Sequence, residues 1–389
     1  MSVVPRSETI AMIERLIAFD TTSRNSNLAL IDFLRTQLEP FGAEIRLTYN
    51  DDHNKANLYA VLGPRGEGGI MLSGHTDVVP TDGQPWESDP FRAILRDDRL
   101  IGRGAADMKG FLGCCLSLIP EYFRRVPKYP LHLAFSYDEE IGCIGVQRMI
   151  ADLAHMDNKP RLGIIGEPTS MKVVAGHKGR YALRCRVRGL ESHSALAHRG
   201  VNAIEAAAEL IVKLKKMGDE LRDSKQLDVD FDPPWTTIQT GLISGGSACN
   251  IVPRDCWFDF EIRTLPNENP DHLITKIKEF AEHEIVPNMR AVFPGAGIDW
   301  EELSFMAGLD AKANTEAADF AIKLSGSDHA GKVSFGTEAG LFQSIGIPSV
   351  VCGPGSAMQA HKPNEFITLE QLAICENFLS RLLDEITEK

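Results

Sequence analysis

Strand-like apolar segments alternate with amphipathic segments over the first 174 residues, and this alternation restricts the fold more than any other feature of the sequence. The strand-like runs are EIRLTY, NLYAVLG, GIMLSGH, LHLAFSYDEE and RLGIIGEPT, and apolar residues at helical spacing lie at 7–20, at about 27–40 and near 144–154. Turn-forming stretches such as GPRGEGG separate them. We therefore predict an α/β fold with an open, mixed sheet, in which ligands bind outside the carboxyl ends of the strands.

From about residue 175 the pattern changes to strand, helix, strand, strand, helix and strand. The segments, in order, are GRYALRCRVRG, VNAIEAAAELIVKLKKM, WTTIQTGLISG, RDCWFDFEIRTLP, DHLITKIKEFAEHEI and RAVFP. This βαββαβ order is that of a ferredoxin-like α+β sandwich. Because the α/β character returns after Gly295, we predict one α/β domain formed by residues 1–174 and 296–389, interrupted by an inserted domain at 175–295.

An excess of acidic residues limits the partners of the chain. Among 389 residues 54 are acidic and 41 basic, and the formal net charge is −13. A surface of this sign repels nucleic acid and anionic membranes and attracts a small cationic ligand, although ordinary solubility explains the same excess. Since no segment has the length needed to cross a bilayer and the start lacks an apolar core of secretory type, we expect a cytoplasmic protein.

The eight cysteines show neither C-x-x-C spacing nor the density of a disulfide scaffold. We expect most of them to be reduced packing residues. Any metal ion should then be held by imidazole and carboxylate groups rather than by thiolates.

The stretch MLSGHTD, residues 71–77, ends an apolar strand with His75 and Asp77 separated by one residue. Alternate residues of a strand point to the same side, so the two side chains can lie together. A carboxylate beside an imidazole is the usual outer support of a metal-bound histidine. A core strand that ends in a polar turn is the other interpretation, and this motif alone does not decide between them.

Further acidic and imidazole residues follow strand ends or glycine-rich turns, as His75 does. Two divalent ions that share one carboxylate need about five such ligands, and the chain offers six groups, with Asp107 as the candidate bridge and one acid left over to act on a water molecule. The six are His75, Asp107, Glu139, Glu140, Glu167 and His361.

Four of these residues also have an ordinary explanation. Glu139 and Glu140 could form a solvated acidic turn, Asp107 a turn before a helix, and His361 part of a surface loop. The position of the two glutamates at the end of the apolar strand LHLAFSY, beside the other candidates, favours the metal site.

The inserted domain contains three further candidates. His193 lies in the loop GLESHSA, Asn250 lies near the glycine-rich turn of GGSACNIVPRD, and Arg263 ends the strand WFDFEIRTLP. The guanidinium of Arg263 could pair with a substrate carboxylate, or it could belong to a surface salt bridge.

Nine motifs stand in one order over nearly the whole chain and resemble those of a known enzyme family. They are SGHTDVVP, LIGRGAADMKG, SYDEEIGCIG, GEPT, HSA, CNIVP, EIRTLP, FGTEAGLF and QAHKPNEF. The chain is similar to the dinuclear zinc family of acetylornithine deacetylases, succinyl-diaminopimelate desuccinylases, aminoacylases and glutamate carboxypeptidases.

The resemblance implies roles for the candidate residues. One zinc ion would be held by His75, Asp107 and Glu167, and the other by Asp107, Glu140 and His361, with cobalt as a substitute metal. Glu139 would be the general base and Asp77 the outer partner of His75. The insert would be a lid and dimerisation domain whose His193 reaches the active site of the other subunit, and Asn250 and Arg263 would contact substrate.

Within the family, GEPTSMKVVAGHKGRYALR and FGTEAGLFQSIGIPSVVCGPGSAMQAHKPNEFI are most similar to the acetylornithine deacetylase branch. This implies hydrolysis of N2-acetyl-L-ornithine to L-ornithine and acetate, in arginine biosynthesis. Glu338 would contact the cationic δ-amine of ornithine, although a glutamate at a helix start is ordinary. The alternatives are desuccinylation of succinyl-diaminopimelate, deacylation of another N-acyl amino acid, and a non-catalytic ligand-binding protein on the same fold.

Overall fold

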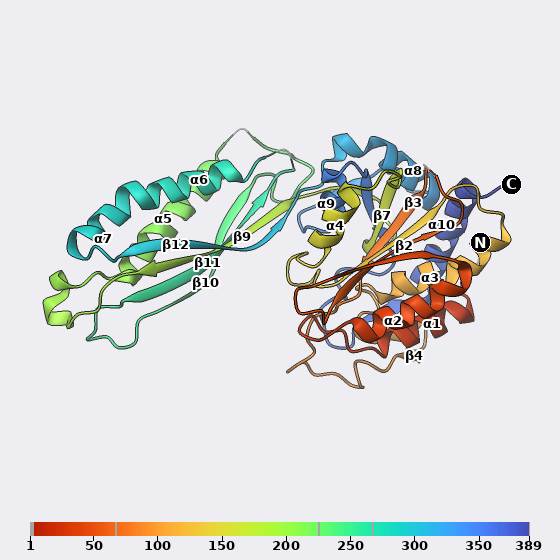
Figure 1. Ribbon diagram of the computed structural model, residues 1–389, viewed down its shortest axis with the longest axis horizontal. Helices are drawn as coiled ribbons and strands as arrows, with labels where there is room; N and C mark the ends of the chain where they lie inside the picture. The colour runs from red at the N-terminus through yellow and green to blue at the C-terminus, as the bar shows by residue number, and fades with distance from the viewer. Residues whose placement is uncertain (1–3, 67, 225, 267, 389) are drawn as a thin grey trace. The chain divides into compact units, whose positions relative to one another are not determined.

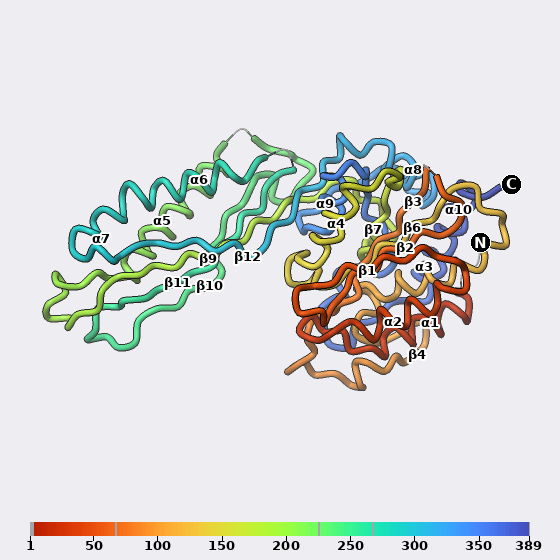
Figure 2. Tube along the Cα trace, in the orientation of Figure 1, coloured from red at the N-terminus to blue at the C-terminus, as the bar shows by residue number. Residues whose placement is uncertain are grey.

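The computed structural model describes residues 4–66, 68–224, 226–266 and 268–388, which form two compact units (Figure 1). The first unit takes in the chain up to Gly176, Leu309–Lys332 and the chain from Thr337 onward, and the second takes in His177–Gly308 and Val333–Gly336. In Figure 2 the first unit contains both the red-to-yellow and the blue parts of the chain. The two ends of the sequence thus lie in one unit.

The first unit is built on a mixed sheet of eight strands among the described residues. Their order is β1-β2-β6-β3-β7-β14-β8-β13. The bounds are Glu44–Tyr49 (β1), Ala56–Leu62 (β2), Ile70–His75 (β3), Leu131–Ser136 (β6), Leu162–Pro168 (β7), Val174–His177 (β8), Gly331–Val333 (β13) and Ser349–Gly353 (β14). Strand β3 runs parallel to β6 and β7, and β7 runs parallel to β14.

The central strands β3, β6 and β7 are buried along their whole length, which requires cover on both faces of the sheet. The cover consists of the helices α1 (Ser7–Ile17), α2 (Leu28–Leu38), α3 (Lys109–Arg124), α4 (Val146–Ala154), α8 (Thr315–Ser325), α9 (Ala339–Ser344) and α10 (Leu369–Ile386). A separate sheet contains β4 (Ile94–Arg96), β5 (Arg99–Ile101) and β15 (Phe366–Thr368). Buried, mostly apolar runs such as LHLAFS thus mark the centre of the sheet.

The second unit contains an antiparallel sheet of order β10-β11-β9-β12 within its described residues. The strands are β9 (Gly179–Arg188), β10 (Thr237–Gly245), β11 (Asp255–Thr264) and β12 (Gly297–Met306), and the helices are α5 (Ala203–Arg222), α6 (Asp271–Phe280) and α7 (Val286–Val292). Alternate residues of β11 are buried, so one face of the sheet forms a core with the helices. The chain order is the predicted βαββαβ.

The last strand and the second boundary of the insert were predicted wrongly. RAVFP was predicted as a strand, but α7 continues to Val292 and the final strand is β12. The boundary after Gly295 therefore falls before β12, which pairs with β9 along Gly297–Met306, and the unit continues to Gly308. The acidic β12 is held by cross-strand contacts such as Arg186 with Glu301 (2.6 Å), which the local sequence does not reveal.

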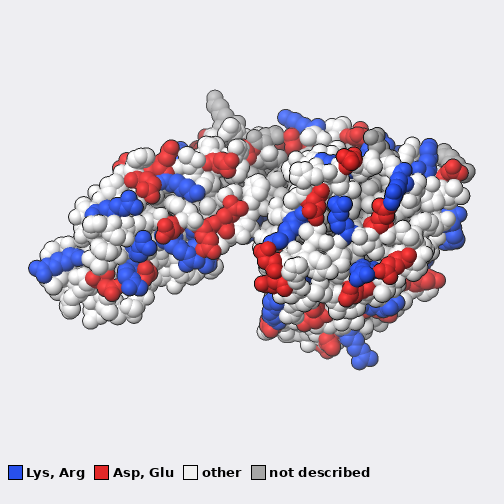
Figure 3. All heavy atoms as spheres, in the orientation of Figure 1, with Lys and Arg blue, Asp and Glu red and all other residues white. Residues whose placement is uncertain are grey.

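Two further features of the structure concern its surface charge and the character of its helices. On the face drawn in Figure 3, acidic and basic side chains are interspersed. Among the described residues, no helix has the length and apolar character that spanning a membrane requires.

Candidate metal centre

Three neighbouring parallel strands bring the candidate ligands together. His75 is the last residue of β3, Glu139 and Glu140 follow the end of β6, and Glu167 lies near the end of β7. Because β3 lies between β6 and β7 and runs parallel to both, these carboxyl ends meet at one edge of the sheet. The sequence prediction rested on this placement.

Asp107 lies between the two candidate imidazoles. Its Oδ1 is 2.9 Å from Nε2 of His75, and its Oδ2 is 3.3 Å from Nε2 of His361. The same nitrogen of His361 is 2.9 Å from Oε2 of Glu140. Each oxygen of Asp107 thus faces a different histidine, the arrangement that a bridging carboxylate requires.

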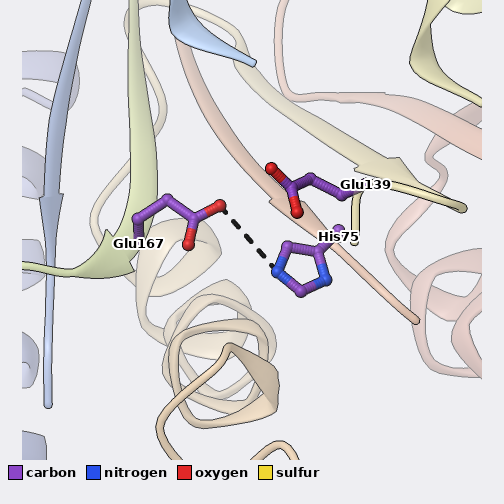
Figure 4. Close-up of side chains that lie close together, drawn as sticks. All are labelled: His75, Glu139 and Glu167. Carbon is purple, nitrogen blue, oxygen red and sulfur yellow. Dashed lines mark ion pairs between the residues drawn. The ribbon is translucent and has the colours of Figure 1, made fainter. Parts of the chain in front are cut away.

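The other side of His75 faces Glu167 and Glu139. Oε1 of Glu167 is 3.8 Å from Nε2 of His75, and Glu139 lies beside this pair (Figure 4). Ligand atoms of His75, Glu139 and Glu167 lie within 4.8 Å of one another, as do those of His75, Asp107 and Glu140. All six predicted residues therefore belong to one cluster.

The cluster suits divalent cations. Oε1 of Glu140 and Oε1 of Glu167 are buried and have no hydrogen-bond partner. A buried carboxylate without a partner is costly, and a cation among several of them removes that cost. The donor set is imidazole and carboxylate, which suits zinc and related ions, whereas the cysteines are free thiols and seven of the eight are buried.

Burial and mutual repulsion shift the titration of these carboxyl groups. Burial raises the pKa of Glu139 to about 7 and that of Glu140 to about 8, and it raises the pKa of Glu167 well above its usual value. Burial acts in the same direction on Asp107, but hydrogen bonds with His361 and His75 lower the pKa of this carboxyl. Hydrogen bonds with Asp107 and Glu140 raise the pKa of His361 to about 10. Bound cations would favour the ionised carboxylates.

Asp77 supports the cluster in two ways. Its backbone carbonyl lies 2.9 Å from Nδ1 of His75 and can only accept, so Nδ1 carries a proton and Nε2 faces Asp107. Its carboxylate, 3.6 Å from Nδ1, accepts the N–H groups of Glu139 (3.1 Å) and Glu140 (3.3 Å) and the hydroxyl of Ser23 (2.7 Å). The carboxylate therefore fixes the two glutamates more directly than it fixes the imidazole.

Two further contacts were missed in the sequence. The thiol of Cys143 donates to Oε1 of Glu139 (3.3 Å), and the hydroxyl of Ser136 donates to Oε1 of Glu338 (2.5 Å). Glu338 is 1% exposed, its Oε2 has no partner, and burial raises its pKa to about 7. Cys143 stands in the quoted motif SYDEEIGCIG, but nothing in its spacing identifies it as a donor to Glu139.

In the second unit, His193 and Asn250 lie together. His193 is exposed, and its Nδ1 accepts the N–H of Ala195 (3.0 Å), so in the neutral ring Nε2 carries the proton. The carbonyl of Asn250 accepts the N–H of Ser194 (3.0 Å). These contacts bring the exposed residues His193 and Asn250 to one surface of the unit.

Arg263 has an internal partner. Its Nε lies 3.1 Å from Oε1 of Glu261 within strand β11. This contact corresponds to the salt-bridge alternative, so a substrate contact by Arg263 stays a prediction.

The model of the peptidase family M20/M25/M40 matches residues 71–385. The chain belongs to this family. An acetylornithine deacetylase of Myxococcus xanthus is 36% identical over 381 residues, which cover 95% of each chain.

Solved structures agree on the fold. An M20 family metallo-carboxypeptidase from Sulfolobus solfataricus aligns with a TM-score of 0.75 at 18% identity, over 97% of this chain and 99% of that one. A dinuclear metal binding M20 peptidase from Bacillus subtilis aligns with a TM-score of 0.63 at 16% identity, over 96% of each chain. With the cluster of imidazoles and carboxylates, family membership makes this chain a metal-dependent hydrolase.

Proposed function

We propose that the enzyme hydrolyses N2-acetyl-L-ornithine to L-ornithine and acetate, a step of arginine biosynthesis in the cytoplasm. The observation that carries the proposal is the meeting of six imidazole and carboxylate groups at the carboxyl edge of the sheet, with Glu139 among them. The name of the Myxococcus xanthus relative supports the choice of substrate.

We propose that the residues of the cluster hold two zinc ions, which cobalt could replace. His75, Asp107 and Glu167 would hold one ion and Asp107, Glu140 and His361 the other. The orphaned oxygens of Glu140 and Glu167 support this assignment. When bound, such ions polarise an acyl carbonyl and acidify a water molecule.

Glu139 is then the general base. Its carboxylate takes a proton from the attacking water and delivers it to the nitrogen of the leaving amine. A base in this role works best with a pKa near the working pH, and burial raises the pKa of Glu139 to about 7 in the metal-free protein. The thiol of Cys143 (3.3 Å) and the backbone contact with Asp77 (3.1 Å) fix its orientation.

The cationic δ-amine of the substrate needs an acidic partner. We propose that this partner is Glu338. Its Oε2 has no hydrogen-bond partner, which supports the assignment. With an exposure of 1%, it would have to become accessible when the substrate binds.

A substrate panel tests the reaction. The enzyme, loaded with a known amount of zinc, would be assayed for kcat/KM with N2-acetyl-L-ornithine, succinyl-diaminopimelate and N-acetylmethionine. We expect the first to be the best substrate, and the Glu139→Gln protein is the control for contaminating activity. A higher kcat/KM for either of the other two would reassign the substrate, and no turnover with any of them would favour a binding protein.

We also propose a homodimer through the insert, in which His193 donates its Nε2 hydrogen to the developing oxyanion in the other subunit. Mixing the Glu139→Gln and His193→Ala proteins tests this. If His193 acts across subunits, equal mixing restores about a quarter of the parent activity, because half of the dimers then contain one complete site. If it acts within its own subunit, the mixture stays inactive.

A further inference from the structure

The loop that carries Asp107 is bound along its backbone by Glu365. This carboxylate is 1% exposed, and its Oε1 accepts the N–H groups of Ala106 (2.9 Å) and Asp107 (3.0 Å). Its Oε2 accepts the N–H of Gly104 (3.1 Å) and a bond from the guanidinium of Arg103 (2.8 Å). Both oxygens therefore have two donors, unlike the carboxylates of Glu140 and Glu167.

The same group of residues reaches the loop that carries His361. Arg103 donates to the carbonyl of Lys362 (3.3 Å) and to the side-chain oxygen of Gln84 (2.5 Å). The amide nitrogen of Gln84 donates in turn to the carbonyl of His361 (2.9 Å). A continuous chain of hydrogen bonds thus joins the backbones on either side of the site.

The loop around His361 needs such restraint. His361 and Asn364 have φ values of 64° and 55°, in the left-handed region that residues with a β-carbon rarely adopt. The side chain of His361 is 55% exposed, so packing alone does not hold it. The side chain of Asn364 accepts the N–H of Glu87 (2.9 Å). This is a second hydrogen bond between the loop of His361 and the loop that contains Gln84.

We propose that Glu365, acting with Arg103 and Gln84, is a positioning residue that sets the separation of Asp107 and His361 and thereby the affinity for divalent ions. The proposal rests on the proposed metal ligands. Glu365 contacts backbone groups and Arg103 rather than the ligand atoms, so it acts through the residues it holds. The loss of an outer support of this kind typically weakens metal binding by about 10- to 100-fold.

The test is the affinity for Zn²⁺, measured by competition with a chromophoric chelator in the full-length protein. For Glu365→Gln we expect both ions to bind about 10- to 100-fold more weakly, because Asp107 would serve both. Glu376→Gln is the matched control, since Glu376 is also a buried carboxylate bound to an arginine and a backbone N–H, in this case those of Arg6. It should lower the melting temperature and leave the affinity for Zn²⁺ unchanged.

A second variant covers the case in which Glu365→Gln does not fold. Gln84→Glu keeps an acceptor for Arg103 and removes the donor to His361, so the ion assigned to His361 should bind more weakly and the other ion as before. Gln37→Glu, on a half-buried side chain of helix α2, is its control. Variants that bind both ions as the parent does, or an equal loss in Glu376→Gln, would overturn the positioning role. A parent protein that binds no Zn²⁺ would overturn the proposed metal centre itself.

Discussion

Buried carboxylates in this protein fall into two groups that differ in their partners. Those of Asp77 and Glu365 are each surrounded by N–H or O–H donors, which hold them in place. Those of Glu140 and Glu167 each keep an oxygen without a partner. The number of donors therefore distinguishes Asp77 and Glu365, which hold backbone groups, from Glu140 and Glu167, which we propose as metal ligands.

At this scale the first prediction concerns Glu139. The Glu139→Gln protein should bind zinc as the parent does, because the ligand set remains, and should lose at least about a hundredfold in kcat, because the carboxamide cannot accept the proton. Steady-state kinetics with metal analysis of the same sample provides the measurement. The Glu376→Gln protein should keep its turnover, and a Glu139→Gln enzyme with normal kcat would remove this residue from the mechanism.

His132 gives a prediction about acid stability. It is 2% exposed, its Nδ1 lies 2.7 Å from the hydroxyl of Tyr59, and burial lowers its pKa to about 4. Between pH 6.5 and 4 the unfolded chain binds a proton that folded His132 does not, so the folded state loses stability as the pH falls.

The free energy of unfolding of the parent should fall by about 3 kcal/mol more than that of His132→Gln between pH 7 and pH 4. Urea titrations at several pH values measure this difference, and the exposed His272→Gln serves as the control. Equal pH dependence in parent and His132→Gln would show that His132 takes up its proton while folded.

At the scale of elements, the central strands, whose carboxyl ends carry the candidate ligands, could be predicted from the sequence. The last strand of the insert, β12, could not. Runs such as LHLAFS and LGIIG are buried throughout and mostly apolar because they lie at the centre of the sheet, and this signal is local. Strand β12 carries Asp299, Glu301 and Glu302, and its pairing depends on the distant β9. The local sequence therefore favoured RAVFP as the last strand, but its residues 290–292 form the end of helix α7.

The contact between β7 and α3 gives a prediction of its own. A β-carbon on Gly166 would lie 2.0 Å from Cδ1 of the fully buried Phe111. Gly166→Ala should therefore lower the free energy of unfolding by about 1–3 kcal/mol through overpacking and, because Glu167 is the next residue, weaken zinc binding. Denaturant titration and chelator competition measure the two effects. Gly241→Ala, in a strand where a β-carbon meets nothing within 4 Å, should change neither.

At the scale of the whole molecule, stability should depend jointly on metal and pH. In the metal-free protein burial raises the pKa of Glu139 to about 7 and that of Glu140 to about 8, above the value of about 4.3 in an unfolded chain. The folded state then binds more protons than the unfolded state, and its stability falls as the pH rises through these values. Divalent cations bind the ionised carboxylates and remove this loss.

We therefore expect zinc to raise the melting temperature more at pH 8.5 than at pH 6.5. Calorimetry with and without a chelator at the two pH values is the measurement. The Glu376→Gln protein should show the same trend, since its altered residue is not among the proposed ligands. A shift that is the same at both pH values, or larger at pH 6.5, would contradict the expectation.

The sequence identified the residues of the cluster but not all of their supports. His75, Glu139 and Glu167 follow apolar strands, so their neighbourhood can be read from the local pattern. Glu365 binds the backbone N–H groups of Ala106 and Asp107, and backbone groups have no signature in a sequence. The hydrogen bonds of Glu365 are therefore seen only in the structure.

Asp107 and His361 also stand far apart in the order of synthesis. Asp107 emerges from the ribosome before the insert, whereas His361 and Glu365 emerge only after the whole insert. A nascent chain therefore lacks His361 and Glu365 until the segment beyond the insert has been synthesised. Premature termination before residue 361 would give a chain that contains Asp107, Glu140 and Glu167. That chain would lack both His361 and Glu365.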